Sequence, residues 1–142
     1  MLIKVKKLDA GAKLPTGAYD HPAGYDLYAL EGNDFIYGNS LCKIRTGIAL
    51  EIPTGYVGLI CDKSGVSSKG LKVYGGVIDS DYRGEIIVML GYMADRANRL
   101  QIKRGEKVAQ ILFIKVEQAK FEECDVLGDT NRGDKGFGSS SN

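Results

Sequence analysis

Short runs of apolar or alternating residues recur along the chain, and a turn signal closes most of them. Alternation of apolar and polar positions is typical of a β-strand with one buried face. No stretch keeps a helical apolar period for three turns, and only SGVSSKG (64–70) predicts a single helical turn, with Ser64 able to cap it. The predicted strands lie at residues 2–6, 25–30, 41–46, 48–52, 56–61, 73–78, 85–90, 100–102, 108–116 and 121–126.

Many short strands at this spacing predict an all-β fold, a jelly-roll-like β-sandwich or barrel. The breakers between the strands include PTG at 15–17, EGND at 31–34, PTG at 53–55 and KRGE at 103–106. No repeat and no interdomain linker interrupts the pattern, and 142 residues suit a single domain, 1–142. The last segment, 128–142, is rich in Gly, Ser and Asp and predicts a mobile tail.

Composition limits the possible binding partners and the expected cellular location of the protein. A formal net charge of +1 argues against nucleic acid, although one small anion could still be held locally. The start MLIKVKKLDA has no long apolar run, so we expect neither a signal peptide nor a membrane span. Three separated cysteines without a CxxC motif predict reduced thiols in a cytoplasmic protein. The single histidine, His21, cannot build a multi-histidine metal site.

The stretch GGVIDSDYRGE (75–85) reads as a β-hairpin with a strongly charged tip. A solvated turn is the plain interpretation, because charge at a turn usually faces water. Two details favour a binding role. Asp79 follows Val77 and Ile78, so alternation could point it into a cleft, opposite to Ile78. The pair Gly75-Gly76 leaves backbone N–H and C=O groups open to a flat heterocycle.

Two further stretches carry groups suited to phosphate. CDKSGVSSKG (61–70) offers hydroxyls, backbone N–H groups and Lys63, which is the chemistry of an anion nest, although a Ser/Gly turn without a ligand is equally possible. RGDKGFGSSSN (132–142) has the composition of a disordered tail. Yet its lone Phe137 could stack on a ligand ring, with Arg132 and Ser139 at hand for phosphate.

Two strand-like stretches each place one polar residue among apolar neighbours. AGYDLYA (23–29) contains Asp26, and GEKVAQI (105–111) contains Gln110. A buried amide needs hydrogen-bond partners, so Gln110 either serves a ligand or satisfies a neighbouring backbone. A structural strand with one polar contact is an equally good interpretation of Asp26.

In order along residues 23 to 140, the stretches AGYDLYA, DKSGVSSKG, GGVIDSDYRGE, GEKVAQ and RGDKGFGSS resemble the five motifs of the homotrimeric dUTPases. The first, third and fifth matches are the specific ones. The second departs from the family pattern, because Asp62-Lys63 stands where Pro-Arg is usual and Ser67 where alanine is usual. We expect the new Asp62 to pair with a nearby cation, and Lys63 itself is a candidate.

The resemblance implies a jelly-roll subunit assembled as a homotrimer. Each active site would take residues from all three chains, and the flexible tail would close over a neighbouring subunit's site. The implied reaction converts dUTP and water to dUMP and pyrophosphate, which limits uracil incorporation into DNA, with Mg²⁺ on the triphosphate.

The resemblance also assigns roles to individual residues. Asp79 would position and activate the attacking water, Tyr82 would pack under the deoxyribose, and Asp26 would contact the water shell of the metal or support the site. The other implied substrate contacts are Gly76, Val77, Ile78 and Ile87 for uracil, Lys63, Ser64, Gly65 and Gln110 for the phosphates, and Arg132, Phe137, Gly138 and Ser139 from the tail. Asp81, Arg83 and Glu85 would brace the hairpin through ion pairs.

Two alternatives stay open at this point. The dCTP deaminases resemble dUTPases in fold and in the second and third motifs, although the IDSDY tip and the Phe-bearing tail favour a dUTPase. A trimeric nucleotide-binding regulator on the same scaffold is the second alternative. No insertion large enough to form a partner-binding domain is present in the sequence.

Overall fold

A computed structural model describes residues 1–32 and 35–134 of the protein. Strands make up nearly all of its regular structure, and the only described helix is one turn, α1 (Ser64–Ser67). The strands are β1 (Lys4–Lys7), β2 (Tyr25–Tyr28), β3 (Ile36–Tyr37), β4 (Ser40–Arg45), β5 (Ile48–Glu51), β6 (Tyr56–Cys61), β7 (Leu71–Tyr74), β8 (Val77–Ile78), β9 (Ile87–Tyr92), β10 (Arg99–Leu100) and β11 (Lys107–Lys115). The predicted all-β class is confirmed.

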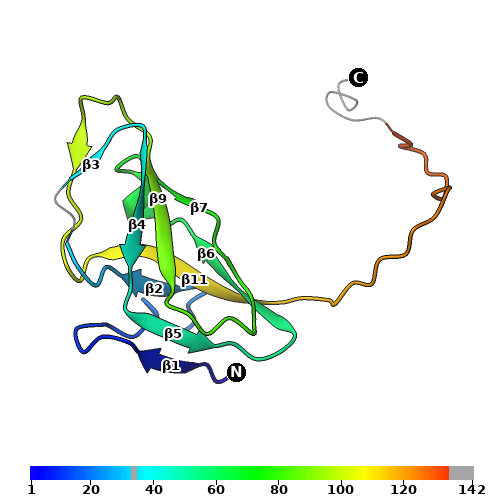
Figure 1. The fold of residues 1–142 in the computed structure, drawn as a ribbon, viewed down its shortest axis with the longest axis horizontal. Helices are drawn as coiled ribbons and strands as arrows, with labels where there is room; N and C mark the ends of the chain where they lie inside the picture. Colours follow the sequence, from blue (N-terminus) through cyan, green and yellow to red (C-terminus); the bar gives the residue numbers. More distant parts are fainter. Residues whose placement is uncertain (33–34, 135–142) are drawn as a thin grey trace.

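Two larger sheets form the body of the molecule (Figure 1). One has the strand order β2-β11-β6-β8 and the other the order β4-β9-β7, and two-stranded pairs β1-β5 and β10-β3 complete the fold. All the paired strands run antiparallel. Antiparallel sheets need only short connections, which agrees with the many turn signals in the sequence.

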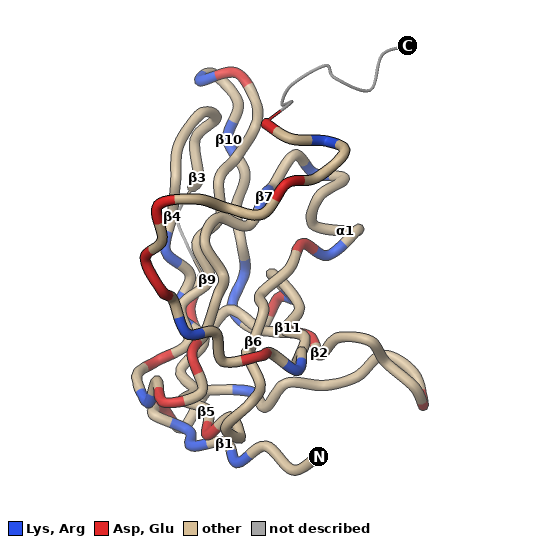
Figure 2. Tube along the Cα trace, turned by 90° about the vertical axis from the view of Figure 1, so that its right-hand side faces the viewer, with Lys and Arg blue, Asp and Glu red and all other residues tan. Residues whose placement is uncertain are grey.

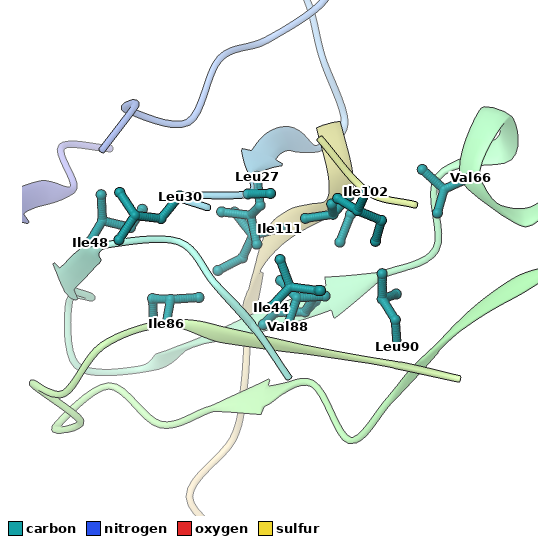
Figure 3. Close-up of a cluster of buried hydrophobic side chains, with 14 of the residues drawn as sticks. Leu27, Leu30, Ile44, Ile48, Val66, Ile86, Val88, Leu90, Ile102 and Ile111 are labelled. Atoms are coloured by element: carbon teal, nitrogen blue, oxygen red, sulfur yellow. The ribbon is translucent and has the colours of Figure 1, made fainter. Parts of the chain in front are cut away.

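The core lies between the two larger sheets. Figure 3 shows Leu27 and Ile111, from β2 and β11, facing Ile44 and Val88, from β4 and β9. In and beside β9 the buried positions alternate, because Ile86, Val88 and Leu90 have 0% exposed surface while Ile87 faces outward. This period of two is the pattern from which the strand was predicted.

Two predicted strands differ from the structure, and one observed strand, β3, was not predicted. The prediction for 73–78 is wrong as one strand, because Gly75 and Gly76 have φ angles of 69° and 104° and separate β7 from β8. The prediction for 121–126 is also wrong, since this segment forms no strand and Phe121 is 97% exposed. An alternating sequence becomes a strand only where an edge is available to pair with it, and no described segment pairs with this one.

The predicted helical turn is present as α1, but Ser64 does not cap it. Lys63 occupies the N-cap position without a side-chain hydrogen bond, and its carbonyl accepts from the N–H groups of Val66 and Ser67 at 2.8 Å. No described helix is long and apolar enough to cross a membrane. Basic and acidic positions are interspersed along the chain in Figure 2.

Candidate active site

Three of the predicted motifs meet because β2, β11 and β6 are neighbours in one sheet. Asp26 on β2 lies directly opposite Gln110 on β11, and Gln110 lies directly opposite Cys61 at the end of β6. Residues directly opposite one another in adjacent strands project from the same face of a sheet. The chain then continues from Cys61 into Asp62 and Lys63, so the second motif begins beside the first and the fourth.

Asp26 is the buried centre of this cluster, with 3% of its surface exposed. The Lys63 ammonium lies 2.8 Å from Oδ1, and the Lys107 ammonium lies 2.7 Å from Oδ2. The Lys107 ammonium is thus the close cationic partner of Oδ2, a buried oxygen. Burial raises the pKa of Asp26, but the contacts with Lys107 and Lys63 outweigh burial and leave the pKa below its ordinary value.

Asp62 and Gln110 tie the second and fourth motifs together. The Gln110 side-chain amide donates to the Asp62 backbone carbonyl at 2.8 Å, which satisfies one of the amide hydrogens as expected for a half-buried glutamine. Asp62 Oδ1 accepts from the Val73 N–H at 2.6 Å, and Oδ2 pairs with the Lys72 ammonium at 2.5 Å. Asp62 therefore pairs with a cation, as predicted, but that cation is Lys72, because the candidate Lys63 pairs with Asp26.

The third motif forms the far end of the hairpin made by β7 and β9, which pair from Leu71 opposite Tyr92 to Tyr74 opposite Met89. The strand β8 leaves this hairpin and pairs with Gly58 and Leu59 of β6. Gly76 makes that change of sheet possible. A Cβ atom at Gly76 would lie 2.6 Å from the Ile60 carbonyl oxygen, and the Gly76 carbonyl accepts from the Ile60 N–H at 2.7 Å.

Hydrogen bonds within the tip hold its shape. The Tyr82 hydroxyl donates to the Glu85 carbonyl at 3.1 Å, and Arg83 donates to the Ser80 carbonyl at 2.7 Å. The Glu85 carboxylate accepts from the Gly47 N–H at 2.8 Å and pairs with Arg45 at 3.1 Å. The predicted ion pair is therefore present for Glu85, whereas Arg83 braces backbone carbonyls instead.

Asp79 is exposed, and so are Val77, Tyr82 and Ile87 beside it. In one chain this group lies far from Lys63. Ile78 pairs with Gly58, so Asp79 continues toward Val57, whereas Lys63 lies beyond the opposite end of β6. The six residue steps from Val57 to Lys63 span roughly 20 Å when extended. The carboxylate and the ammonium of one chain therefore cannot reach the same phosphate group.

The chain also resembles known proteins over nearly its whole length. The family model described as dUTPase matches residues 10–141. The deoxyuridine 5'-triphosphate nucleotidohydrolase of Corynebacterium glutamicum is 41% identical over 141 residues, which are 97% of this chain and 93% of that protein. The chain belongs to the dUTPase family.

Solved structures of dUTPases have the same fold. The Staphylococcus bacteriophage 80alpha dUTPase with dUPNHPP is 28% identical, with a TM-score of 0.89 over 98% of both chains. The D95N dUTPase from phage phi11 of S. aureus, which coordinates a structural Mg(II) ion, is 25% identical, with a TM-score of 0.80 over 89% of this chain and 98% of that one. The family and the relatives favour neither a dCTP deaminase nor a purely regulatory protein.

The described residues of this dUTPase do not form a resident metal site. Among them, no three His, Cys, Asp or Glu side chains gather in one place. The carboxylate predicted to serve the metal, Asp26, already lies between two ammonium groups. Mg²⁺ prefers oxygen ligands and commonly binds through one or two carboxylates and substrate phosphates. The described residues of one chain therefore offer no ready-made cluster of ligands for Mg²⁺, and the water-mediated role of Asp26 stays a prediction.

The tail residues are only partly described. Arg132 is exposed, and Phe137, Gly138 and Ser139 lie outside the described residues. A groove of about 990 Å³ lies elsewhere, at the end of the β4-β9-β7 sheet, and none of the predicted site residues lines it.

Sequence reasoning missed Lys107 and Lys72, which hold Asp26 and Asp62. The signal for Lys107 was its place in GEKVAQI, three residues before Gln110. Regular alternation would place these two residues on opposite faces, so only the observed strand register shows that they belong together.

Proposed function

We propose that the protein hydrolyses dUTP to dUMP and pyrophosphate in sites formed between the subunits of a homotrimer. The observation that carries the proposal is the separation of Asp79 from the Asp26, Lys63 and Gln110 cluster in a chain that contains all of them. Asp79 suits the attacking water and the cluster suits phosphate. Because the two lie apart in one chain, only a second chain brings an Asp79 to the cluster. A third chain would contribute the tail, with Arg132, Phe137, Gly138 and Ser139.

The reaction needs a water molecule that attacks the α-phosphorus in line with the departing pyrophosphate. Phosphoryl transfer has a loose transition state in most analyses, so positioning and charge neutralisation contribute more than a strong base. Asp79 orients this water. Lys63, Ser64, Gly65 and Gln110 bind the phosphates, and Mg²⁺ arrives on the triphosphate as part of the substrate, where it neutralises charge.

Base selection follows from a stiff hairpin. The backbone of Gly76, Val77 and Ile78, with Ile87, presents hydrogen-bonding groups and an apolar contact to uracil. Cytosine would set donor against donor, at a cost of roughly 1–3 kcal/mol per unpaired group. Thymine is excluded because its methyl group clashes with the hairpin. This exclusion works only if the hairpin is rigid. The contacts of Glu85 with Gly47 and Arg45 supply that stiffness.

Sugar selection depends on Tyr82. Its ring lies so close to Gly84 that a Cβ atom there would be 2.3 Å from the Tyr82 hydroxyl oxygen. Together with the hydrogen bond to the Glu85 carbonyl, this contact fixes the ring in the position where it packs under the deoxyribose. A 2′-hydroxyl then has no room, so UTP is a poor substrate.

A pyrophosphate-release assay with dUTP, dTTP, dCTP and UTP, with and without Mg²⁺, tests the proposal. Of the four nucleotides, we expect only dUTP to release pyrophosphate, and we expect Mg²⁺ to increase the rate. Asp79→Asn should lower kcat by about 10²–10⁴-fold, while the matched control Asp81→Asn, on the same tip, should stay close to the wild-type rate. Similar rates with all four nucleotides, or an active monomer in sedimentation, would contradict the proposal.

A further inference from the structure

The register between β2 and β11 contains a β-bulge beside the phosphate-binding cluster. Gln110 lies opposite Asp26, and Lys107 lies opposite Tyr28. Between these two pairs β2 advances by two residues and β11 by three. The extra residue of β11 lies between Lys107 and Ala109. A bulge re-aims the side chains that follow it and often occurs next to active sites.

The bulge decides which residue joins the cluster. In a regular ladder Val108 would stand opposite Tyr28, on the face shared by Asp26 and Gln110. With the bulge, Val108 is buried in the core and Lys107 takes the place on that face. A cationic side chain, Lys107, thereby stands where a regular ladder would place the apolar Val108, beside the predicted phosphate ligands.

The charges of the cluster do not balance. The buried Asp26 carboxylate is the shared partner of two ammonium groups, one from Lys63 and one from Lys107. The side chains of Lys63 and Lys107 keep 28% and 45% of their surface exposed, whereas that of Asp26 keeps 4%. One lysine would suffice to compensate one carboxylate. The second leaves a net positive charge that faces solvent, which suits an anion.

We propose that Lys107 is a second phosphate-binding lysine, and that Asp26 is the positioning residue that holds Lys107 and Lys63 side by side. The ligand is the triphosphate of a nucleotide, so this inference rests on the proposed function. A guanidinium can bind two phosphate oxygens with one side chain, whereas an ammonium is a single point charge. Two lysines on one carboxylate restore two points of contact where the second motif has Lys63 in place of arginine.

Calorimetric titration of the full-length protein with dUPNHPP and with dUMP, in the presence of Mg²⁺, tests the role of Lys107. We expect Lys107→Met to weaken dUPNHPP binding about tenfold, as for the loss of one charge-assisted contact, and to leave dUMP binding nearly unchanged. Lys107→Arg should keep most of the affinity. The matched control is Lys115→Met, which removes an exposed lysine from the other end of β11. Equal losses of dUPNHPP and dUMP affinity, or no loss, would overturn the inference.

A double variant separates phosphate contact from simple charge balance. If Lys107 only compensates Asp26, removal of both charges in Lys107→Met/Asp26→Asn should restore dUPNHPP affinity. We expect no restoration, because the phosphate contact is gone in both variants. If the wild-type protein releases pyrophosphate from dUTP and Lys107→Met binds dUPNHPP as tightly as wild type, this inference is overturned and the proposed function stands. Wild-type protein that neither binds dUPNHPP nor hydrolyses dUTP would overturn the proposed function and the inference with it.

Discussion

At the scale of single residues, Asp62 and Lys63 show how a motif is held when its usual residues change. Lys63 pairs with Asp26 on β2, and Asp62 pairs with Lys72 and with the Val73 backbone on β7. Each of the two substituted positions thus gains a partner on another strand. The turn that a proline would stiffen through its ring is stiffened here by charge and hydrogen bonds.

This explanation predicts a pH-dependent stability that Asp62 carries. Burial raises the pKa of Asp62, but the contacts with Lys72 and Val73 outweigh burial, so the pKa lies below the ordinary value of 3.8. A carboxyl with a lowered folded-state pKa stabilises the fold above its unfolded-state pKa. That contribution is lost as the pH falls through the folded-state pKa.

The measurement is the free energy of unfolding in urea between about pH 3 and pH 7. Wild-type protein should be more stable than Asp62→Asn at neutral pH, and the difference should shrink as the pH falls below the ordinary carboxyl value. Asp20→Asn is the control, because Asp20 is exposed and has no ion pair among the described residues. A difference between wild type and Asp62→Asn that does not change with pH would contradict the role of the ionised carboxylate.

At the scale of elements, the pair Gly75-Gly76 connects the two larger sheets. It ends β7 in one sheet and lets β8 pair with β6 in the other, so the backbone that we propose reads uracil is fixed at both ends. Only glycine adopts the φ angle of 104° at position 76 without strain and also leaves room for the Ile60 carbonyl. The stiffness of the proposed base-binding hairpin therefore depends on Gly76, which has no side chain.

Gly76→Ala should lower the free energy of unfolding by about 2 kcal/mol, from backbone strain and the clash with Ile60. It should also raise the KM for dUTP, because β8 shifts relative to β6. Urea denaturation and initial-rate kinetics measure the two effects. Gly128→Ala is the control, since a Cβ atom there would meet nothing within 4 Å. Equal stability of the two variants would show that the close approach at Gly76 does not matter.

The sequence alone was sufficient for the all-β class and for the approximate positions of most strands, although it did not predict β3 (Ile36–Tyr37). The strand at 56–61 was predicted with the bounds it has in the structure, because alternation and flanking turns are local signals. The split at Gly75-Gly76 and the absence of a strand at 121–126 depend on which edges are free for pairing. The bulge that brings Lys107 to Asp26 depends on register. Pairing and register are properties of the folded sheet, so no local pattern reveals them.

At the scale of the whole molecule, one chain carries the two halves of the proposed site in separate places. The segment that follows β11 also leaves the body of the protein (Figure 1). Its apolar residues Phe121, Val126 and Leu127 are exposed and pack against nothing in the described chain. Apolar side chains left in this way are stabilised by burial against another chain. Both features agree with the proposed homotrimer.

Subunit complementation tests this central claim most directly. Asp79→Asn and Lys63→Ala chains are produced together, so that trimers contain both, and pyrophosphate release from dUTP is compared with each variant alone. If one chain supplies Asp79 and another supplies Lys63, about one quarter of the sites (one half times one half) receive both intact residues, and activity returns. If both residues of a site come from the same chain, every site stays defective. Mixed trimers as inactive as the separate variants would therefore contradict a site shared between subunits.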